Sequence, residues 1–256
     1  MLWEAGTLGI EVSTSEGHAQ LLAYFEERPD IEFDLRTSLT PFGAEVERAA
    51  VPNVDWVARF REGFRAFQVG PFQIVPDWDL DPRPGLASPN LTLRVDPGQA
   101  FGTGTHETTQ LCLLALADLA SRGSLGRVLD LGAGTGILAI AAVRLGASIA
   151  VGLDNDPEAI TSARRHAALN DASLALIVAD GAAALSRGQF DLVLANVTAR
   201  MLLERRDEIA ALRSESGRLI LSGFLLSDLP DIQASYARLG RLEVRTAGEW
   251  AAAVVD

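Results

Sequence analysis

The sequence predicts an α/β protein with a mostly parallel, seven-stranded sheet and helices on its faces. From Val128 onward, short apolar runs alternate with longer stretches of helical periodicity, which is the pattern of a parallel sheet. A glycine-rich turn follows the first of these runs, as expected where a strand leads into a helix beside a ligand site. The last two runs lie close together and predict a hairpin at the edge of the sheet.

The main domain is expected to contain seven strands and five helices. The strands are expected at Arg127–Leu131, Ile149–Asp154, Leu174–Ala179, Phe190–Ala195, Arg218–Leu221, Leu242–Thr246 and Trp250–Val255. Good helix formers at helical spacing predict helices at Gln110–Leu119, Ile137–Leu145, Pro157–Leu169, Ala199–Leu212 and Leu226–Leu239.

The first fifty residues have a different texture and predict a small α+β lobe. Leu8–Val12 and Ile31–Leu35 are interpreted as strands that flank a helix at His18–Glu27. Pro41 and Pro52 then mark the start of a connecting region.

The connecting region is expected to pack the lobe against the main domain. Trp56, Phe60 and Phe64 recur every four residues, which places three aromatic rings on one helical face. A strand is expected at Val69–Val75, and the proline-rich stretch Pro76–Pro89 is expected to be a loop. The expected parts are a substrate-recognition lobe over 1–52, a connecting helix, strand and loop over 53–90, and the main domain over 91–256.

Composition limits the class of protein and its partners. The 256 residues are 48% hydrophobic and 22% charged, which is typical of a soluble globular protein, and no apolar run reaches the ~20 residues of a membrane span. The formal net charge of −12 disfavours a nucleic-acid partner and favours a basic protein or an amine, although solubility alone also explains it. One cysteine and three scattered histidines predict no internal disulfide, no metal site and a reducing, cytoplasmic location. All 22 basic residues are arginine.

A glycine-rich motif carries the first functional signal. The run from Asp130 to Gly136 reads DLGAGTG, and glycines at alternate positions permit a tight turn and close approach of a ligand to the backbone. Asp154 ends the next strand, where an acid can accept both hydrogen bonds of a ribose diol. Asp180 follows the third strand, where an acid can accept from an adenine amine.

A nicotinamide-dinucleotide site is the alternative for this motif. The run GTGILA from Gly134 satisfies the loose G-x-G-x-x-A form, and Asp154 follows at a fitting distance. Three features argue against a nicotinamide-dinucleotide site: the leading Asp130, the glycines directly at the strand end, and Asn196 after the fourth strand. This combination resembles the class I S-adenosylmethionine-dependent methyltransferases.

A second loop makes the resemblance more specific. The run from Asp96 to Thr109 reads DPGQAFGTGTHETT and leads into a helix; taken alone it is an ordinary loop with threonine caps. The runs ILAIAA, LGA, DNDP, AN, LSG and GEW, which begin at residues 137, 145, 154, 195, 221 and 248, agree with the same family. From about Asp55 to the C-terminus, the chain resembles the methyltransferases of ribosomal large-subunit protein eleven, known as PrmA.

The resemblance implies S-adenosylmethionine as cofactor and the amino groups of that ribosomal protein, both lysine side chains and the N-terminus, as substrate. Family members bind the cofactor through the positions that match Thr109, Gly132, Asp154 and Asn196, and Phe101, Gly134 and Asp180 complete the expected cofactor site. Asn196, His106 and Trp250 are expected near the reacting amine. The enzyme is expected to act as a monomer, with its N-terminal lobe recognising the substrate. The alternatives are a methyltransferase of another protein lysine or a small amine, and an inactive cofactor-binding module.

Three departures from the family pattern stand out. The usual Cys-Gly-Ser-Gly is AGTG from Ala133, which keeps the glycines. His166 replaces a usual asparagine and is expected to be a solvated helix residue. The segment Leu2–Gly6 matches the end of the family's first helix, so the lobe is expected to be truncated, which bears on substrate recognition and leaves cofactor binding untouched.

Overall fold

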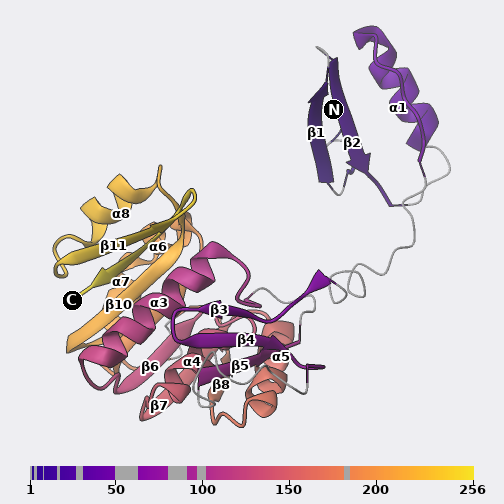
Figure 1. Cartoon of the computed structure of the whole chain (residues 1–256). Coiled ribbons are helices and arrows are strands. Elements are labelled where there is room, and N and C mark those ends of the chain that lie inside the picture. Colours follow the sequence, from indigo (N-terminus) through magenta and orange to yellow (C-terminus); the bar gives the residue numbers. More distant parts are fainter. Residues whose placement is uncertain are drawn as a thin grey trace. The chain divides into compact units, whose positions relative to one another are not determined.

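The structure is a computed structural model, and it divides into unit 1, Met1–Val54, and unit 2, Asp55–Asp256 (Figure 1). It describes residues 2, 5–7, 9–15, 18–26, 31–49, 63–79, 91–96, 102–181 and 185–256. The expected aromatic stripe therefore lies largely outside the described residues, as does most of the proline-rich loop. Within the described part, no helix is long and apolar enough to cross a membrane.

Unit 1 contains a β-hairpin where a strand and a helix are expected. The first expected strand is confirmed as β1 (Gly9–Ser15), but the helix predicted at His18–Glu27 is wrong, because β2 (His18–Tyr24) lies there and pairs antiparallel with β1. Ser15 pairs with His18, so only two residues separate the strands, which is the commonest hairpin connection. Cross-strand pairing therefore overrides the helical propensity of this segment.

The strand predicted at Ile31–Leu35 is also wrong. The segment belongs to helix α1 (Ile31–Leu39), which is followed by a short 3₁₀ turn, η1 (Thr40–Phe42). Arg36 Nη2 lies 2.9 Å from Glu32 Oε1, one helical turn away. The alternation of apolar residues suggests a strand, yet Phe33 is 74% exposed, so the alternating positions do not share a buried face.

Unit 2 begins with a small sheet of three strands. β3 (Phe67–Val69) and β4 (Phe72–Pro76) are antiparallel, and β5 (Thr92–Val95) runs parallel to β4. One strand is predicted here, but Gly70, whose φ of +54° is left-handed, turns the chain between two. Phe64, from the expected stripe, is buried, and its ring lies 5.9 Å from that of Phe67.

The main sheet has seven strands in the order β11-β12-β10-β9-β6-β7-β8. All neighbouring strands from β10 to β8 are parallel, and β12 lies antiparallel between β10 and β11. The strands are β6 (Arg127–Leu131), β7 (Ile149–Asp154), β8 (Ala175–Val178), β9 (Phe190–Asn196), β10 (Arg213–Leu225), β11 (Leu242–Ala247) and β12 (Trp250–Val255). The predicted sheet and its edge hairpin are confirmed.

Helices cover both faces of this sheet. Successive residues of its central strands accordingly alternate between two hydrophobic clusters, one on each face. Val128 of β6 packs in the first cluster and Leu129 in the second. The first cluster includes the small sheet, α3 (Glu107–Arg122) and α4 (Ile137–Arg144), and the second includes α6 (Ala199–Glu204), α7 (Arg206–Leu212) and α8 (Leu229–Tyr236). α5 (Pro157–Leu169) has the predicted bounds.

The long helix predicted at Ala199–Leu212 is divided in two. It breaks at Arg205, whose φ of −105° and ψ of 19° are not helical, although the segment contains neither proline nor glycine. The break allows α6 and α7 to bury Leu202 and Ile209 against the same cluster. Tertiary packing therefore sets the division.

Candidate cofactor and amine site

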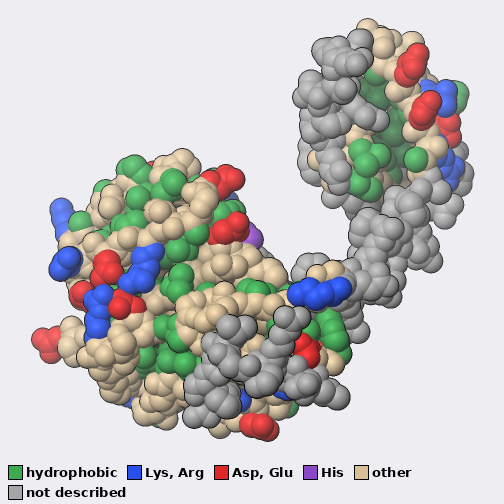
Figure 2. Space-filling model, viewed as in Figure 1, with side chains coloured by type: hydrophobic (Ala, Val, Ile, Leu, Met, Phe, Trp, Pro, Cys, Tyr) green, Lys and Arg blue, Asp and Glu red, His purple; other side chains and the backbone are tan. Residues whose placement is uncertain are grey.

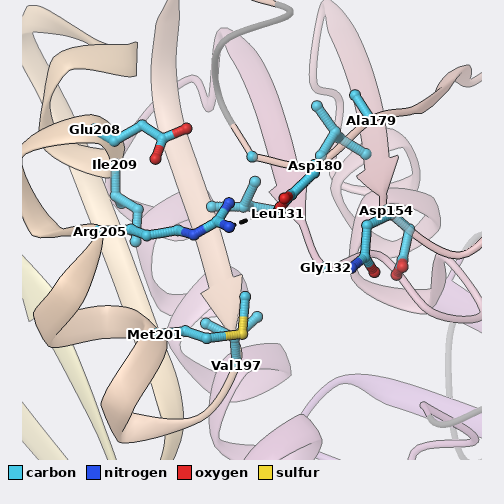
Figure 3. A pocket seen from close by; sticks show the side chains of 13 residues that line it. Leu131, Gly132, Asp154, Ala179, Asp180, Val197, Met201, Arg205, Glu208 and Ile209 are labelled. Carbon is cyan, nitrogen blue, oxygen red and sulfur yellow. Dashed lines mark ion pairs between the residues drawn. The ribbon is translucent and has the colours of Figure 1, made fainter.

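Four predicted site residues lie where parallel strands end at one edge of the main sheet. β6 leads into Gly132, β7 ends at Asp154, Asp180 follows β8, and β9 ends at Asn196. In open α/β sheets, ligands bind in the crevice outside these carboxyl ends. A pocket lies there, lined by Gly132, Asp154 and Asp180 among others (Figure 3).

The glycine loop forms the floor of this pocket. Gly132 has φ +74° and donates from its N–H to the carbonyl of Leu153 at 2.8 Å. A Cβ on Gly132 would lie 2.7 Å from Val197 Cγ1, so a side chain would fill space between the loop and the end of β9. Gly132 itself is exposed and lines the pocket, so its backbone is open to contact by a ligand, whereas an added side chain would collide with Val197.

Asp154 is tied to the loop that it faces. Its Oδ2 accepts from Gly134 N at 2.9 Å, and its Oδ1 accepts from Asp156 N at 3.0 Å. Each carboxylate oxygen has two lone pairs, so each retains one acceptor position. The geometry suits the predicted recognition of a diol.

Asp130 lies beneath the loop and is almost fully buried. Its Oδ2 accepts from Ala139 N, at the start of α4, at 3.1 Å. Burial raises the pKa of Asp130 to about 7; the Ala139 hydrogen bond opposes this rise, and the negative charge of Asp154 adds to it. The acid of the motif is therefore a buried support of the loop.

The opposite wall of the pocket consists of residues that the sequence did not predict. Arg205 Nη2 lies 2.7 Å from Asp180 Oδ1, and Figure 3 shows the guanidinium directed at that carboxylate. Met201, Glu208 and Ile209 complete this wall from α6 and α7. No local motif marks these residues; the only signal is that their helices follow β9 at the ligand edge.

Thr109 and Asn196 form a second group beside the first. Asn196 Nδ2 lies 3.5 Å from Thr109 Oγ1, which joins the end of β9 to the first turn of α3. Asn196 Oδ1 is buried and has no hydrogen-bond partner among the described residues. Leaving a buried acceptor unpaired is unfavourable, so this oxygen marks a position for a donor from a ligand.

His106 and Trp250, both predicted near the reacting amine, lie next to each other. Their ring centroids are 4.8 Å apart in an edge-to-face arrangement. His106 is the N-cap of α3, because its Nδ1 accepts from Thr108 N at 3.3 Å. That bond requires an unprotonated Nδ1, which assigns the ring proton of neutral His106 to Nε2.

The family described as ribosomal protein L11 methyltransferase (PrmA) matches residues 6–256. The ribosomal protein L11 methyltransferase of Geobacter sulfurreducens is 38% identical over 251 residues, which cover 92% of this chain and 81% of that protein. This chain belongs to the PrmA family.

Solved structures agree with this membership. The ribosomal protein L11 methylase of Lactobacillus delbrueckii subsp. bulgaricus is 33% identical, with a TM-score of 0.67 over 75% of this chain and 98% of that one. The T. thermophilus 16S rRNA N2 G1207 methyltransferase, solved with AdoMet and guanosine, is 24% identical with a TM-score of 0.51 over 63% of this chain and 46% of that one. Unit 2 has the class I methyltransferase fold predicted from the sequence.

Two expectations based on the PrmA family concern Phe101 and His166. Phe101 lies outside the described residues, so its predicted contact with the cofactor stays a prediction. The prediction that His166 is solvated is wrong: its side chain is buried, Nε2 accepts from Asp96 N at 3.1 Å, and Nδ1 donates to the carbonyl of Ser162 at 2.9 Å. Burial lowers the pKa of His166, which suits a neutral ring that joins α5 to the end of β5.

Thr135, within the glycine motif, is a further residue whose position the sequence did not predict. Its hydroxyl donates to the carbonyl of Gly102 at 2.6 Å and is buried. The bond ties the loop before α3 to the loop after β6. In this PrmA chain, the two predicted motifs are therefore parts of one site.

Proposed function

We propose that this chain transfers methyl groups from S-adenosylmethionine to amino groups of ribosomal protein L11. The observation that carries the proposal is the PrmA match over residues 6–256, which includes both units. The loop, the acids and the asparagine at the ligand edge supply the functional groups that such a reaction needs.

The residues at this edge fit S-adenosylmethionine. Asp154 offers acceptors for the ribose hydroxyls, Asp180 offers one for the adenine amine, and Gly132 is exposed at the pocket. The related T. thermophilus methyltransferase, which shares this fold, was solved with AdoMet bound. When bound, the cofactor supplies an electrophilic methyl group on a sulfonium.

Asn196 orients the amine in this proposal. Its unpaired Oδ1 accepts an N–H from the substrate nitrogen, which directs the lone pair at the methyl group. The nitrogen must be neutral to attack, and free lysine has a pKa near ~10.4, so the proton leaves before transfer. The rings of His106 and Trp250 lie beside the amine in this proposal. Nδ1 of His106 accepts the hydrogen bond that caps α3, so this nitrogen does not take a proton from the substrate.

Unit 1 is the proposed site of substrate recognition. The side chains of Leu21, Phe33 and Phe42 are exposed in this unit. Figure 2 shows hydrophobic areas in green on its described surface. A bound protein would cover these exposed apolar side chains, which is the reason for assigning recognition to this unit. The net charge of −12 favours encounter with a basic ribosomal protein.

The proposed setting is the cytoplasm, with the enzyme acting as a monomer and making no direct contact with nucleic acid. In the view of Figure 2, acidic and basic side chains are interspersed on unit 2, so long-range attraction is assigned to net charge rather than to one patch on that face.

The test is incubation of purified L11 with the protein and S-adenosylmethionine carrying a labelled methyl group, followed by mass spectrometry. Because the chain contains no lysine, every labelled methyl-lysine in the mixture lies on the substrate. A basic protein of similar charge and free lysine serve as competing acceptors. Label on L11 alone supports the proposal, whereas label only on the competitors, or cofactor binding without transfer, refutes it.

A further inference from the structure

The wall opposite the glycine loop holds an arginine that no cofactor motif includes. Arg205 Nη2 binds Asp180 Oδ1 at 2.7 Å across the pocket (Figure 3). Gly181, which follows Asp180, has φ +75°. A Cβ on Gly181 would collide with Arg205 Nη1 and lie 2.6 Å from Glu208 Oε1. Gly181 therefore leaves room for the guanidinium against the backbone.

The helix break places this arginine. Arg205 is the C-cap of α6 and precedes α7, and its N–H donates to the carbonyl of Met201 at 3.0 Å. Its non-helical backbone lies at the point where the chain passes the pocket, and Met201 and Ile209 line the pocket on either side of it in sequence. The break thus presents a cation at the base end of the predicted site.

We propose that Arg205 is a positioning residue that makes the pocket selective for a purine with a 6-amino group. The inference rests on the proposed function, because it takes the adenosine part of S-adenosylmethionine as the ligand. Arg205 engages Oδ1 of Asp180; the Asp180 side chain lines the pocket and is 69% exposed, and its second carboxylate oxygen, Oδ2, is not used by this ion pair. That oxygen is available to accept from the amino group of the base.

The chemistry of the pair explains the selectivity. A carboxylate only accepts hydrogen bonds and a guanidinium only donates them. A 6-oxo purine would bring a second acceptor to the carboxylate, and the guanidinium that could donate to it is held by Asp180. An ion pair between exposed groups adds little to stability, and the side chains of Asp180 and Arg205 are 69% and 34% exposed, so the pair is expected to contribute little to folding.

The experiment compares two ligands by calorimetric titration of the full chain: S-adenosylhomocysteine and its deaminated analogue, S-inosylhomocysteine. We expect the wild type to prefer the adenine form by about tenfold or more. Arg205→Gln should lower that preference at least threefold, because the carboxylate is no longer held. Asp180→Ala should abolish it, because the released guanidinium can donate to the 6-oxo group.

The matched control is Arg200→Gln, in the helix α6 that Arg205 caps. Arg200 Nε lies 2.7 Å from Glu204 Oε1 in an exposed pair that does not line the pocket, so this variant should keep the wild-type preference. Both ligands are titrated on the same protein, so partial unfolding lowers the stoichiometry and leaves the ratio of affinities intact.

The inference is overturned if the wild type binds both ligands equally, if Arg205→Gln changes the ratio less than threefold, if Arg200→Gln changes it as much, or if Asp180→Ala keeps the preference. A wild type that binds neither ligand would instead overturn the proposed function. The result that overturns the role of Arg205 therefore differs from the result that overturns the proposed function.

Discussion

Asp130→Asn should remove a pH-dependent loss of stability from this protein. Burial raises the pKa of Asp130 from 3.8 to about 7, so the native state keeps the proton that the unfolded chain releases. Stability from this group is fully present below pH 3.8 and is lost as the pH rises through about 7. Asparagine mimics the protonated acid and can still accept from Ala139 N, so the variant should not show this loss.

The size of the effect follows from the pKa. One pKa unit corresponds to ~1.36 kcal/mol, so the whole shift amounts to about 4 kcal/mol, as an upper limit. Most of the interval from pH 5 to pH 8 lies below the native pKa. The wild type should therefore lose up to about 3 kcal/mol of unfolding free energy over that interval relative to Asp130→Asn.

The assay is urea unfolding of both proteins, without cofactor, at pH 5, 6, 7 and 8. Asp171→Asn controls for the loss of one negative charge, because Asp171 is exposed. Stabilities of wild type and Asp130→Asn that change in parallel with pH would refute the reasoning. A variant less stable than the wild type at pH 8 would refute it as well.

Three further predictions concern the ligand edge. Asp154→Ala should weaken S-adenosylmethionine binding about 10- to 150-fold in calorimetry, through ~1.5–3 kcal/mol of lost charge-assisted bonds, and a folded variant with unchanged affinity would contradict the diol role. Gly132→Val should abolish binding, whereas Gly146→Val, with φ +88° and no atom within 4 Å of an added Cβ, carries backbone strain alone and should still bind. Asn196→Ala should lower the single-turnover methylation rate at least ~10-fold, by much more than it weakens cofactor binding and with little change in thermal stability, because it removes an unpaired acceptor; a stable variant with wild-type turnover would exclude Asn196 from the amine site.

The sequence predicted the bounds of an element correctly where its hydrophobic periodicity ended at a residue that terminates or starts a helix or strand. β6, β7, β12 and α5 have the predicted bounds, because apolar runs there end at glycine, aspartate or proline. The predictions for β2 and α1, both in unit 1, were wrong. Pairing with β1 opposes the helical propensity of β2, and an i,i+4 ion pair favours helix in α1. Short segments with little buried surface carry too weak a periodic signal to distinguish helix from strand.

The sequence by itself determined the parallel sheet, its edge hairpin and the positions of Gly132, Asp154, Asp180 and Asn196, because carboxyl ends of parallel strands meet at one edge. Only the tertiary structure decided the rest of the site. It divided a continuous helical pattern at Arg205, buried His166 against the backbone of β5, and bonded Thr135 to the loop before α3. These contacts join residues far apart in the chain, so their energies depend on packing between elements and leave no periodic trace in the sequence.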